Sequence, residues 1–205
     1  QQAISKCSTD ETLKIIGSVF MTFNLETIIF EENILPSIFG IEEATIRPAR
    51  MQLLRSYIAE SALPVIFYDE ISAKSMGISN ERYTYIPVKN NDSFQHAKHV
   101  FLLLAPEGKQ EATHLIFLTI SANLTKAGWY RNIEFADIEI LRKDSSHPLK
   151  SGLLRIYNQL EYWVKQVSLD SNILRSMQKL KQFIAGLSEK KGYPVLWTGK
   201  ESLSE

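Results

Sequence analysis

Five polar residues that could act on one ligand follow one another along the middle of the chain: His96 and Lys98, then Ser121 and Asn123, then Glu134. Side chains alternate between the two faces of a strand, so a histidine and a lysine two positions apart project to the same face. A neutral imidazole is a competent nucleophile toward phosphorus, while lysine, amide and hydroxyl groups supply donors for phosphate oxygens. These residue types therefore predict a phosphate site with its own nucleophile.

The segments around these residues predict a β-hairpin that holds them together. The apolar runs 100–104 and 115–120 fit buried strands, and the polar segment 105–112, which contains Pro106 and Gly108, is typical of a turn. Such a hairpin brings the His96–Lys98 pair and the Ser121–Asn123 pair to the same end of a sheet. On the strand that contains His96, His99 should face the opposite side and serve packing or solvent.

The rest of the chain alternates between strand and helix patterns. Strands are expected at 19–23, 65–68, 83–87 and 133–141, with a further one starting near 192. Helices are expected from a capping sequence at 8–11 through Ile16, from Asn24 to about Gly40, and at 50–60, 149–167 and 171–187. Strands mixed with helices favour an α/β sandwich.

The ordered His-x-Lys, Ser-x-Asn and later Glu resemble the signature of the phospholipase D superfamily, over about residues 94–141. The run 121–129, followed by 132–134, is similar to the first half of tyrosyl-DNA phosphodiesterases and to bacterial nuclease domains of that superfamily. Two positions depart from the family pattern. Leu103 stands where an aspartate is often found, and Ile120 replaces the glycine before the serine; both departures also occur in the tyrosyl-DNA phosphodiesterase branch.

The resemblance implies a phospholipase D-like α-β-α sandwich with a mixed β-sheet and one motif half per chain. Residues 1–145 would form the catalytic half, and residues 146–205 a helical extension leading toward a possible second half. The implied activity is that of a phosphodiesterase, a hydrolase of the nuclease or DNA-end-processing type, working through a phosphohistidine on His96. The alternatives are a phospholipid hydrolase or transferase, and a catalytically silent scaffold domain of the same fold.

The resemblance also suggests a role for each residue of the motif. His96 would attack phosphorus, while Lys98, Ser121 and Asn123 would bind the phosphate and stabilise the charge of the transition state. Glu134 is the candidate carboxylate that accepts the other ring N–H of His96 and fixes its tautomer. The catalytic set is therefore His96, Lys98, Asn123 and Glu134.

The superfamily joins two motif halves, one histidine attacking and the other protonating the leaving group. This chain carries one His-x-Lys motif, so we expect either a homodimer or a second half in a longer chain, and activity only when two halves meet. The start at Gln1, without a methionine, agrees with a fragment or a trimmed product.

Composition narrows the possible partners. The chain has 205 residues, with 23 basic and 23 acidic side chains, so net charge provides no general attraction to nucleic acid or membrane. Nucleic acid is still the expected partner, through a substrate rim that includes Lys126 and Trp129; the alternative for Trp129 is a cover for the edge of the core. Two alternatives remain for a further set of cations, which either form a local basic rim or belong to an ordinary solvated surface: Lys89, Lys98, Lys109, Lys126 and Arg131.

Other classes of site and location find no support in the sequence. The single Cys7 excludes an internal disulfide and fits a reducing compartment, so a cytoplasmic protein is expected. No apolar run approaches the length of a membrane span, and no signal peptide is visible. No cluster has metal-ligand spacing, so we expect metal-independent chemistry without a cofactor and no membrane partner.

Overall fold

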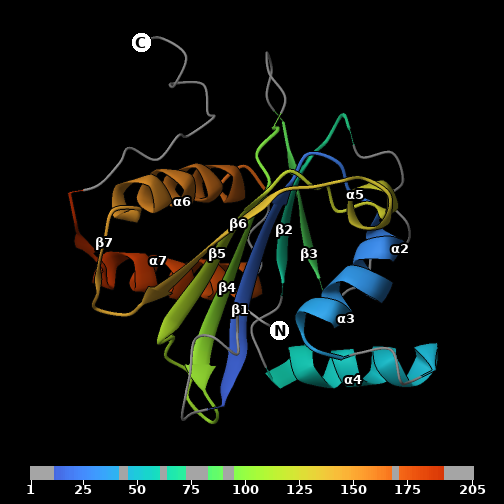
Figure 1. The fold of residues 1–205 in the computed structure, drawn as a ribbon, viewed down its shortest axis with the longest axis horizontal. Helices are drawn as coiled ribbons and strands as arrows, with labels where there is room; N and C mark the ends of the chain where they lie inside the picture. Colours follow the sequence, from blue (N-terminus) through green and yellow to red (C-terminus); the bar gives the residue numbers. More distant parts are fainter. Residues whose placement is uncertain are drawn as a thin grey trace.

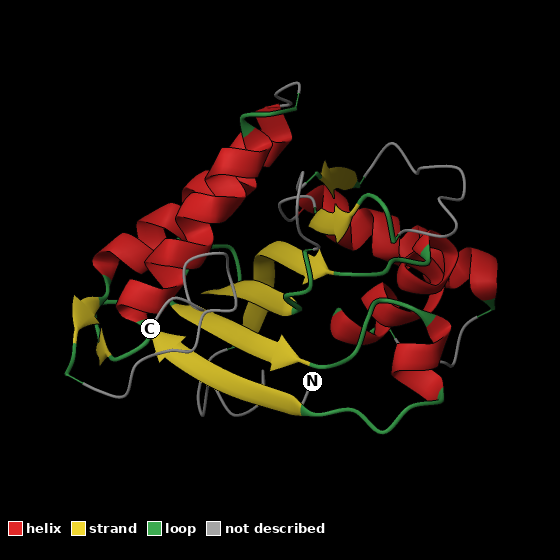
Figure 2. Ribbon diagram, turned by 90° about the horizontal axis from the view of Figure 1, so that it is seen from above, coloured by secondary structure: helices red, strands yellow, loops and turns green. Residues whose placement is uncertain are grey.

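The computed structural model describes residues 12–41, 46–60, 64–72, 83–89, 95–167 and 171–191. A six-stranded mixed sheet, in the order β3-β2-β1-β4-β5-β6, lies between two layers of helices (Figures 1 and 2). The predicted α-β-α sandwich is thereby confirmed.

The sheet combines a parallel and an antiparallel part. β1, β2 and β3 run parallel, and β4, β5 and β6 form an antiparallel meander whose first strand pairs with β1. One end of the sheet therefore contains the ends of β1, β2, β3 and β5 and the starts of β4 and β6. We call this end of the strands the site edge. The strands are β1 Leu13–Thr22, β2 Val65–Asp69, β3 Thr84–Val88, β4 His99–Pro106, β5 His114–Ile120 and β6 Ala136–Arg142.

Helices cover both faces of this sheet (Figure 1). One layer consists of α6 and α7, and two short paired strands, β7 before α6 and β8 after α7, adjoin it. The other layer contains α2, a π-helical turn, α3 and α4. The short helix α5 links β5 to β6. The bounds are α2 Thr27–Ile29, the π-helical turn Phe30–Ile34, α3 Leu35–Ile38, α4 Arg47–Glu60, α5 Lys126–Tyr130, β7 Ser146–His147, α6 Lys150–Val164, α7 Ser171–Gly186 and β8 Ser188–Glu189.

The central strands are apolar on both faces because each face has its own core. Phe101 and Leu103 of β4 pack in the cluster that includes α6 and α7, whereas Val100 and Leu102 pack in the cluster that includes Phe30 and α4. Strands covered on both sides show continuous apolar runs rather than alternation. This explains why the runs at 65–68 and 100–104 predict strands without a polar face.

The hairpin predicted around the motif is confirmed, because β4 and β5 pair antiparallel with His99 opposite Thr119. The helix predicted through Ile16 is wrong. Leu13, Ile15 and their neighbours instead extend β1 against the end of β4, with a bulge between Ile15 and Gly17. β-branched apolar residues that pair with a neighbouring strand favour this outcome over a helix.

Most other predicted elements are present with shifted ends. The helix expected after Asn24 is confirmed but begins at Thr27 and contains the π-helical turn, and Gly40 follows it with φ +70°. The predicted strand 133–141 begins only at Ala136. The capping sequence at 8–11 and the strand expected from 192 lie outside the described residues. Within the described ranges no helix is long and apolar enough to cross a membrane.

Candidate active site

The structure brings the sequence-predicted residues together at the site edge of the sheet, the end near α2 and α5 in Figure 1. His96 and Lys98 lie in the segment that enters β4, so they precede the strand rather than lying within it. Ser121 and Asn123 follow β5, and Glu134 precedes β6. Main-chain hydrogen bonds fix these segments side by side: Ile120 N–H donates to the carbonyl of Lys98 at 3.1 Å, and Ser121 N–H to that of Phe135 at 3.0 Å.

His96 and Lys98 form the centre of the site. The Nζ atom of Lys98 lies 3.4 Å from each ring nitrogen of His96 and donates to the His96 carbonyl at 2.9 Å. The Lys98 side chain is buried with only 6% exposure, whereas His96 is exposed. In this arrangement the imidazole is accessible to a ligand, and the ammonium group of Lys98 lies beside it on the buried side.

The electrostatics of this pair favour a neutral imidazole. Burial, and then the positive charge of Lys98, lower the pKa of His96 from its ordinary value of 6.5. Burial also lowers the pKa of Lys98, and the negative charge of Glu134 opposes that shift. A histidine with a lowered pKa is unprotonated at neutral pH, which is the state required of a nucleophile.

Phe23, directly after β1, forms a wall of the site that the sequence pattern does not indicate. Its ring centroid lies 4.9 Å from that of His96, with the rings inclined by 50°, and 5.8 Å from Nζ of Lys98. An aromatic face attracts a cation through its quadrupole. Phe23 therefore contacts both members of the His96–Lys98 pair.

Asn123 is oriented by the chain that follows β1. Its Oδ1 accepts the main-chain N–H of Asn24 at 3.1 Å, so its Nδ2 group is the part that remains for a phosphate oxygen. The buried hydroxyl of Thr22 donates to the carbonyl of Asn24 at 2.8 Å and accepts the N–H of Leu124 at 3.1 Å. Sequence reasoning missed Thr22 and Asn24, because they lie about 100 residues from Asn123 and belong to no local motif.

Gly128 holds helix α5 close to Asn123. A Cβ atom at position 128 would lie 2.5 Å from the carbonyl oxygen of Asn123 and 2.9 Å from its nitrogen, closer than packing allows. Thr125 caps the helix by accepting the N–H of Gly128 at 3.2 Å. The run from Ser121 to Trp129 is therefore one compact unit in which the helix fixes the loop that carries Asn123.

Glu134 contacts the phosphate-binding loop rather than the nucleophile. The hydroxyl of Ser121 donates to its carboxylate, and Nδ2 of Asn132 donates to it at 3.2 Å. The Ser121 hydroxyl also accepts the N–H of Phe135 at 2.8 Å. In the described structure His96 is not among the hydrogen-bond partners of Glu134. The role of Glu134 in fixing the His96 tautomer stays a prediction.

The residues expected at the rim separate into two groups. Lys126 and Trp129 are exposed on α5 beside the site, Trp129 to 38%. Lys109 follows the far end of β4, and Lys89 pairs with Glu70 at 3.2 Å, so the five candidate cations do not form one continuous rim. Exposed apolar side chains flank the site instead: Tyr130 at 60%, Ile133 at 94% and Phe135 at 80%.

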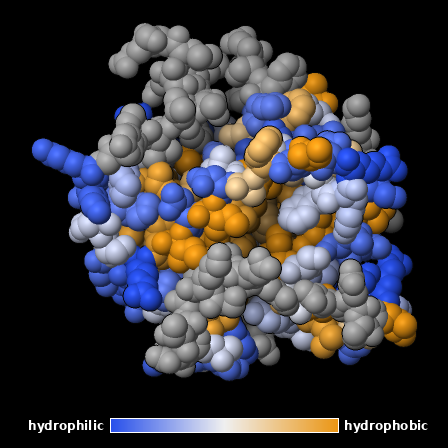
Figure 3. Space-filling view, in the orientation of Figure 1, coloured by the Kyte–Doolittle hydropathy of each residue, from blue (hydrophilic) through white to orange (hydrophobic). Residues whose placement is uncertain are grey.

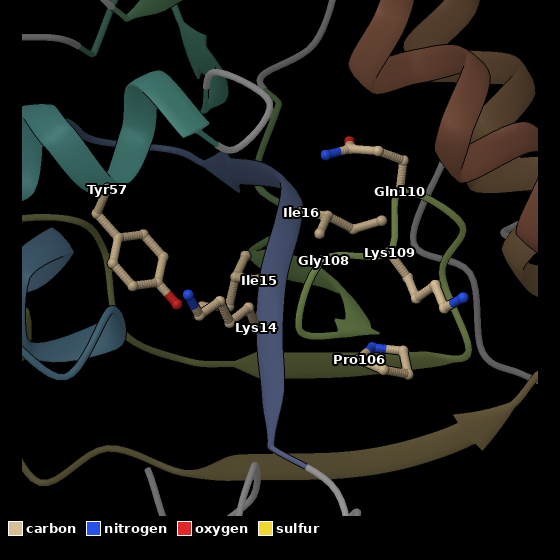
Figure 4. Close-up of a pocket in the computed structure, with 8 residues that line it drawn as sticks. All are labelled: Lys14, Ile15, Ile16, Tyr57, Pro106, Gly108, Lys109 and Gln110. Atoms are coloured by element: carbon tan, nitrogen blue, oxygen red, sulfur yellow. The ribbon is translucent and has the colours of Figure 1, made fainter.

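Apolar surface also gathers over the middle of the sheet on the face shown in Figure 3, between the helical layers. A separate small pocket of about 140 Å³ lies at the opposite end of the sheet (Figure 4). Lys14, which lines it, already pairs with Glu107 at 2.6 Å. Among the described residues, no three His, Cys, Asp or Glu side chains come together as a metal site requires.

Comparison with known proteins identifies the fold. No protein-family model and no curated protein sequence matches the chain. Two crystal structures of yeast tyrosyl-DNA phosphodiesterase mutants, each with one histidine substituted, do match. Both superpose with a TM-score of 0.50, 11% identity and coverage of 87% of this chain, against 36% of one matched chain and 37% of the other.

This chain thus spans little more than a third of the length of those structures. At this level of identity the likeness shows the fold alone. The chain has the fold of one half of yeast tyrosyl-DNA phosphodiesterase, an enzyme of the phospholipase D superfamily.

Proposed function

We propose that this chain is one motif half of a phosphodiesterase that forms a phosphohistidine on His96. The observation that carries the proposal is the pairing of an exposed, neutral imidazole with the buried cation of Lys98, whose Nζ lies 3.4 Å from each ring nitrogen. Asn123 and Ser121 lie at the same edge of the sheet. A nucleophile and several phosphate donors in one place are the parts that phosphoryl transfer requires.

The reaction proceeds in two displacements. A ring nitrogen of His96 attacks phosphorus, the P–N bond forms, and the P–O bond to the departing alcohol breaks as that oxygen takes a proton. Water then attacks the phosphohistidine and gives its proton to the group that protonated the departing alcohol, the P–N bond breaks, and the histidine is released with a phosphate monoester. Lys98 and the Nδ2 group of Asn123 stabilise the charge on the phosphate oxygens in both transition states.

The leaving group needs an acid, and none of the other histidines, all of which the structure describes, lies at the site to provide it. In-line displacement places the attacking and departing atoms on opposite sides of phosphorus, and a general acid must lie within hydrogen-bond reach of its target. His99 is buried between strands and His114 starts β5 at the far end of the sheet. We propose that a second motif half, in a second copy or in a longer chain, supplies the acid.

The proposed substrate is a nucleic acid, cleaved internally or at a modified end. Lys126 and Arg131 are exposed cations beside the exposed aromatic residues Trp129 and Tyr130. Cations that follow a phosphate backbone, together with aromatic faces on which bases stack, are typical of sites for single strands. The similarity of fold to a tyrosyl-DNA phosphodiesterase supports the same substrate class.

The experiment that tests this function compares three diesters in excess EDTA: bis-p-nitrophenyl phosphate, a single-stranded oligonucleotide and phosphatidylcholine vesicles. We expect turnover of the first two without added metal, because Lys98 and Asn123 stabilise the negative charge on the phosphate oxygens. Turnover of the vesicles alone would establish the phospholipid alternative. No turnover of any diester, at concentrations where two copies associate or with the second half added, would establish a silent scaffold.

A further inference from the structure

Asp69 is a buried carboxylate at the site edge of the sheet that the proposed reaction does not use directly. It ends β2 and is only 2% exposed. Its Oδ1 accepts the N–H groups of Ile71 at 3.1 Å and Ser72 at 3.0 Å, and its Oδ2 accepts the N–H of Gln95 at 2.9 Å. A buried charge is tolerated when hydrogen bonds satisfy it, and here three main-chain donors do so.

The Gln95 contact is the one that bears on chemistry, because Gln95 directly precedes His96. The segment 95–98 lies before β4, and among the described residues its main-chain hydrogen bond to β5 is made at Lys98, beyond His96. Gln95 holds it from the other side as well, since its Nε2 donates to the carbonyl of Ala97 at 2.9 Å. His96 is thus bracketed by two hydrogen bonds of Gln95, one of which ends on Asp69.

We propose that Asp69 is a positioning residue for His96: its carboxylate anchors Gln95 to the end of β2 and thereby sets where the imidazole meets the phosphate. The inference rests on the proposed function for its catalytic consequence. Its structural part, the anchoring of Gln95, stands independently of any activity. The hydrogen bond between Asp69 and Gln95 matters because a displacement of a reacting group by about 1 Å can lower the rate roughly a hundredfold.

Substitution Asp69→Asn isolates the Gln95 contact. Asparagine keeps one oxygen, and that oxygen satisfies more donors when it faces Ile71 and Ser72. The amide NH2 group then faces the N–H of Gln95, so donor meets donor. Asp69→Ser is the second variant, because a serine hydroxyl can still cap the turn at Ile71 and Ser72 but is too short to reach Gln95.

The experiment measures amide hydrogen exchange at Gln95 and turnover of bis-p-nitrophenyl phosphate per folded molecule. The control is Ile184→Val, a buried change in α7 that lowers stability away from the site. In Asp69→Asn and Asp69→Ser we expect exchange at Gln95 to accelerate about tenfold or more while the Ile120 amide is unchanged. We expect kcat to fall roughly 10- to 100-fold with KM changed by less than about twofold. The control should change neither.

The outcomes separate this inference from the proposed function. If the unmodified protein turns over no diester, the function fails, and exchange at Gln95 alone decides whether Asp69 anchors the His96 segment. If the unmodified protein is active and both variants keep its kcat, or if exchange at Gln95 is unchanged, the inference is overturned. If neither variant folds, Asp69 serves the fold and not the site, which also overturns it.

Discussion

At the scale of residues, the site depends on one buried cation beside one exposed imidazole. Burial lowers the pKa of both groups, and the positive charge of Lys98 lowers the pKa of His96 further. Glu134 acts in the other direction on Lys98, because its carboxylate favours the charged ammonium. The pair is therefore adjusted to keep the lysine charged while the histidine is neutral.

The pH dependence of turnover follows from these directions. With bis-p-nitrophenyl phosphate, whose leaving group needs no acid, the rate should rise as His96 loses its proton, with a midpoint below 6.5. It should fall again as Lys98 loses its proton, with a midpoint below 10.5. Lys98→Arg, which keeps its charge at high pH, should remove the alkaline fall. An acid midpoint above 6.5 would contradict the environment described for His96.

Residue types alone predict only part of this site. The order His96, Lys98, Ser121, Asn123, Glu134 indicates a phosphate site, because each type has a chemical role in it and short spacings place pairs on one face. Phe23, Asn24 and Asp69 give no such signal. Phe23 and Asn24 follow the end of β1 and Asp69 ends β2, so these residues contact the motif only after the sheet has formed. Their roles depend on tertiary contacts that a local pattern does not contain.

His99 provides a test of burial at the residue scale. It packs 5.3 Å from the ring of Phe117, as expected for a residue facing away from His96, and burial together with the Lys98 charge lowers its pKa to about 4. The unfolded chain takes up this proton near pH 6.5 and the folded chain only near 4, so the unfolded state binds more protons between these values. Stability is full above pH 6.5 and falls as pH falls toward 4.

A shift from 6.5 to about 4 corresponds to a loss of about 3 kcal/mol in the free energy of unfolding by pH 4. In His99→Gln this ionisable group is absent. Between pH 7.5 and pH 4 the variant should therefore lose about 3 kcal/mol less of its free energy of unfolding than the unmodified protein loses. Urea unfolding of both proteins at pH 7.5 and pH 4 measures the difference, in which the other titrating groups cancel. An equal loss in both proteins would show that His99 is not the group responsible.

At the scale of elements, Asn123 depends on how closely helix α5 approaches the loop. Gly128→Ala would place a Cβ 2.5 Å from the Asn123 carbonyl oxygen, and that backbone atom must move. The intrinsic gain of alanine in a helix, about 1 kcal/mol, is smaller than an overpacking penalty of about 1–3 kcal/mol. We expect a net loss of stability and a fall in turnover of roughly 10- to 100-fold.

The matched control is Ala127→Ser, at an exposed position of the same short helix. It should leave both urea unfolding and turnover near the values of the unmodified protein. A Gly128→Ala protein with unchanged turnover would mean that the close packing of α5 does not determine the position of Asn123.

Elements with a strong pattern of their own are the ones that the sequence predicts well. The apolar runs of β2, β4 and β5 and the periodic helices α6 and α7 are found where they are expected, because their patterns match their burial. The start of β1 is not, since Leu13 to Ile16 become a strand through pairing with the end of β4. A partner strand some 90 residues away overrides the local preference.

At the scale of the whole molecule, apolar side chains are exposed beside the last strand of the sheet. β6 is the last strand of the sheet, and Ile133 and Phe135, which flank Glu134, are 94% and 80% exposed. Apolar side chains of this size exposed together mark surfaces for interaction. Together with the coverage of little more than a third of the matched structures, they agree with the proposed pairing of two halves.

If two copies complete the site, activity should depend on association. Specific activity toward the oligonucleotide, whose leaving group needs the acid, should rise with protein concentration in parallel with the dimer fraction measured by sedimentation. An excess of His96→Ala chains should then suppress the unmodified protein by forming mixed dimers, whereas an equal excess of an unrelated protein should not. If the second half belongs to a longer chain, the isolated monomer is inactive until that half is added. A monomer that is fully active at nanomolar concentration would contradict the two-half account.

The most direct test of the central claim is a search for the covalent intermediate. The protein, at a concentration where two halves associate or with the second half added, is mixed with a phosphodiester and quenched in alkaline denaturant within milliseconds. Mass spectrometry then locates the adduct. The account predicts a phosphoryl adduct on the peptide that contains His96, and its loss together with a roughly thousandfold or greater fall in turnover in His96→Asn. Turnover in His96→Asn equal to that of the unmodified protein would contradict it.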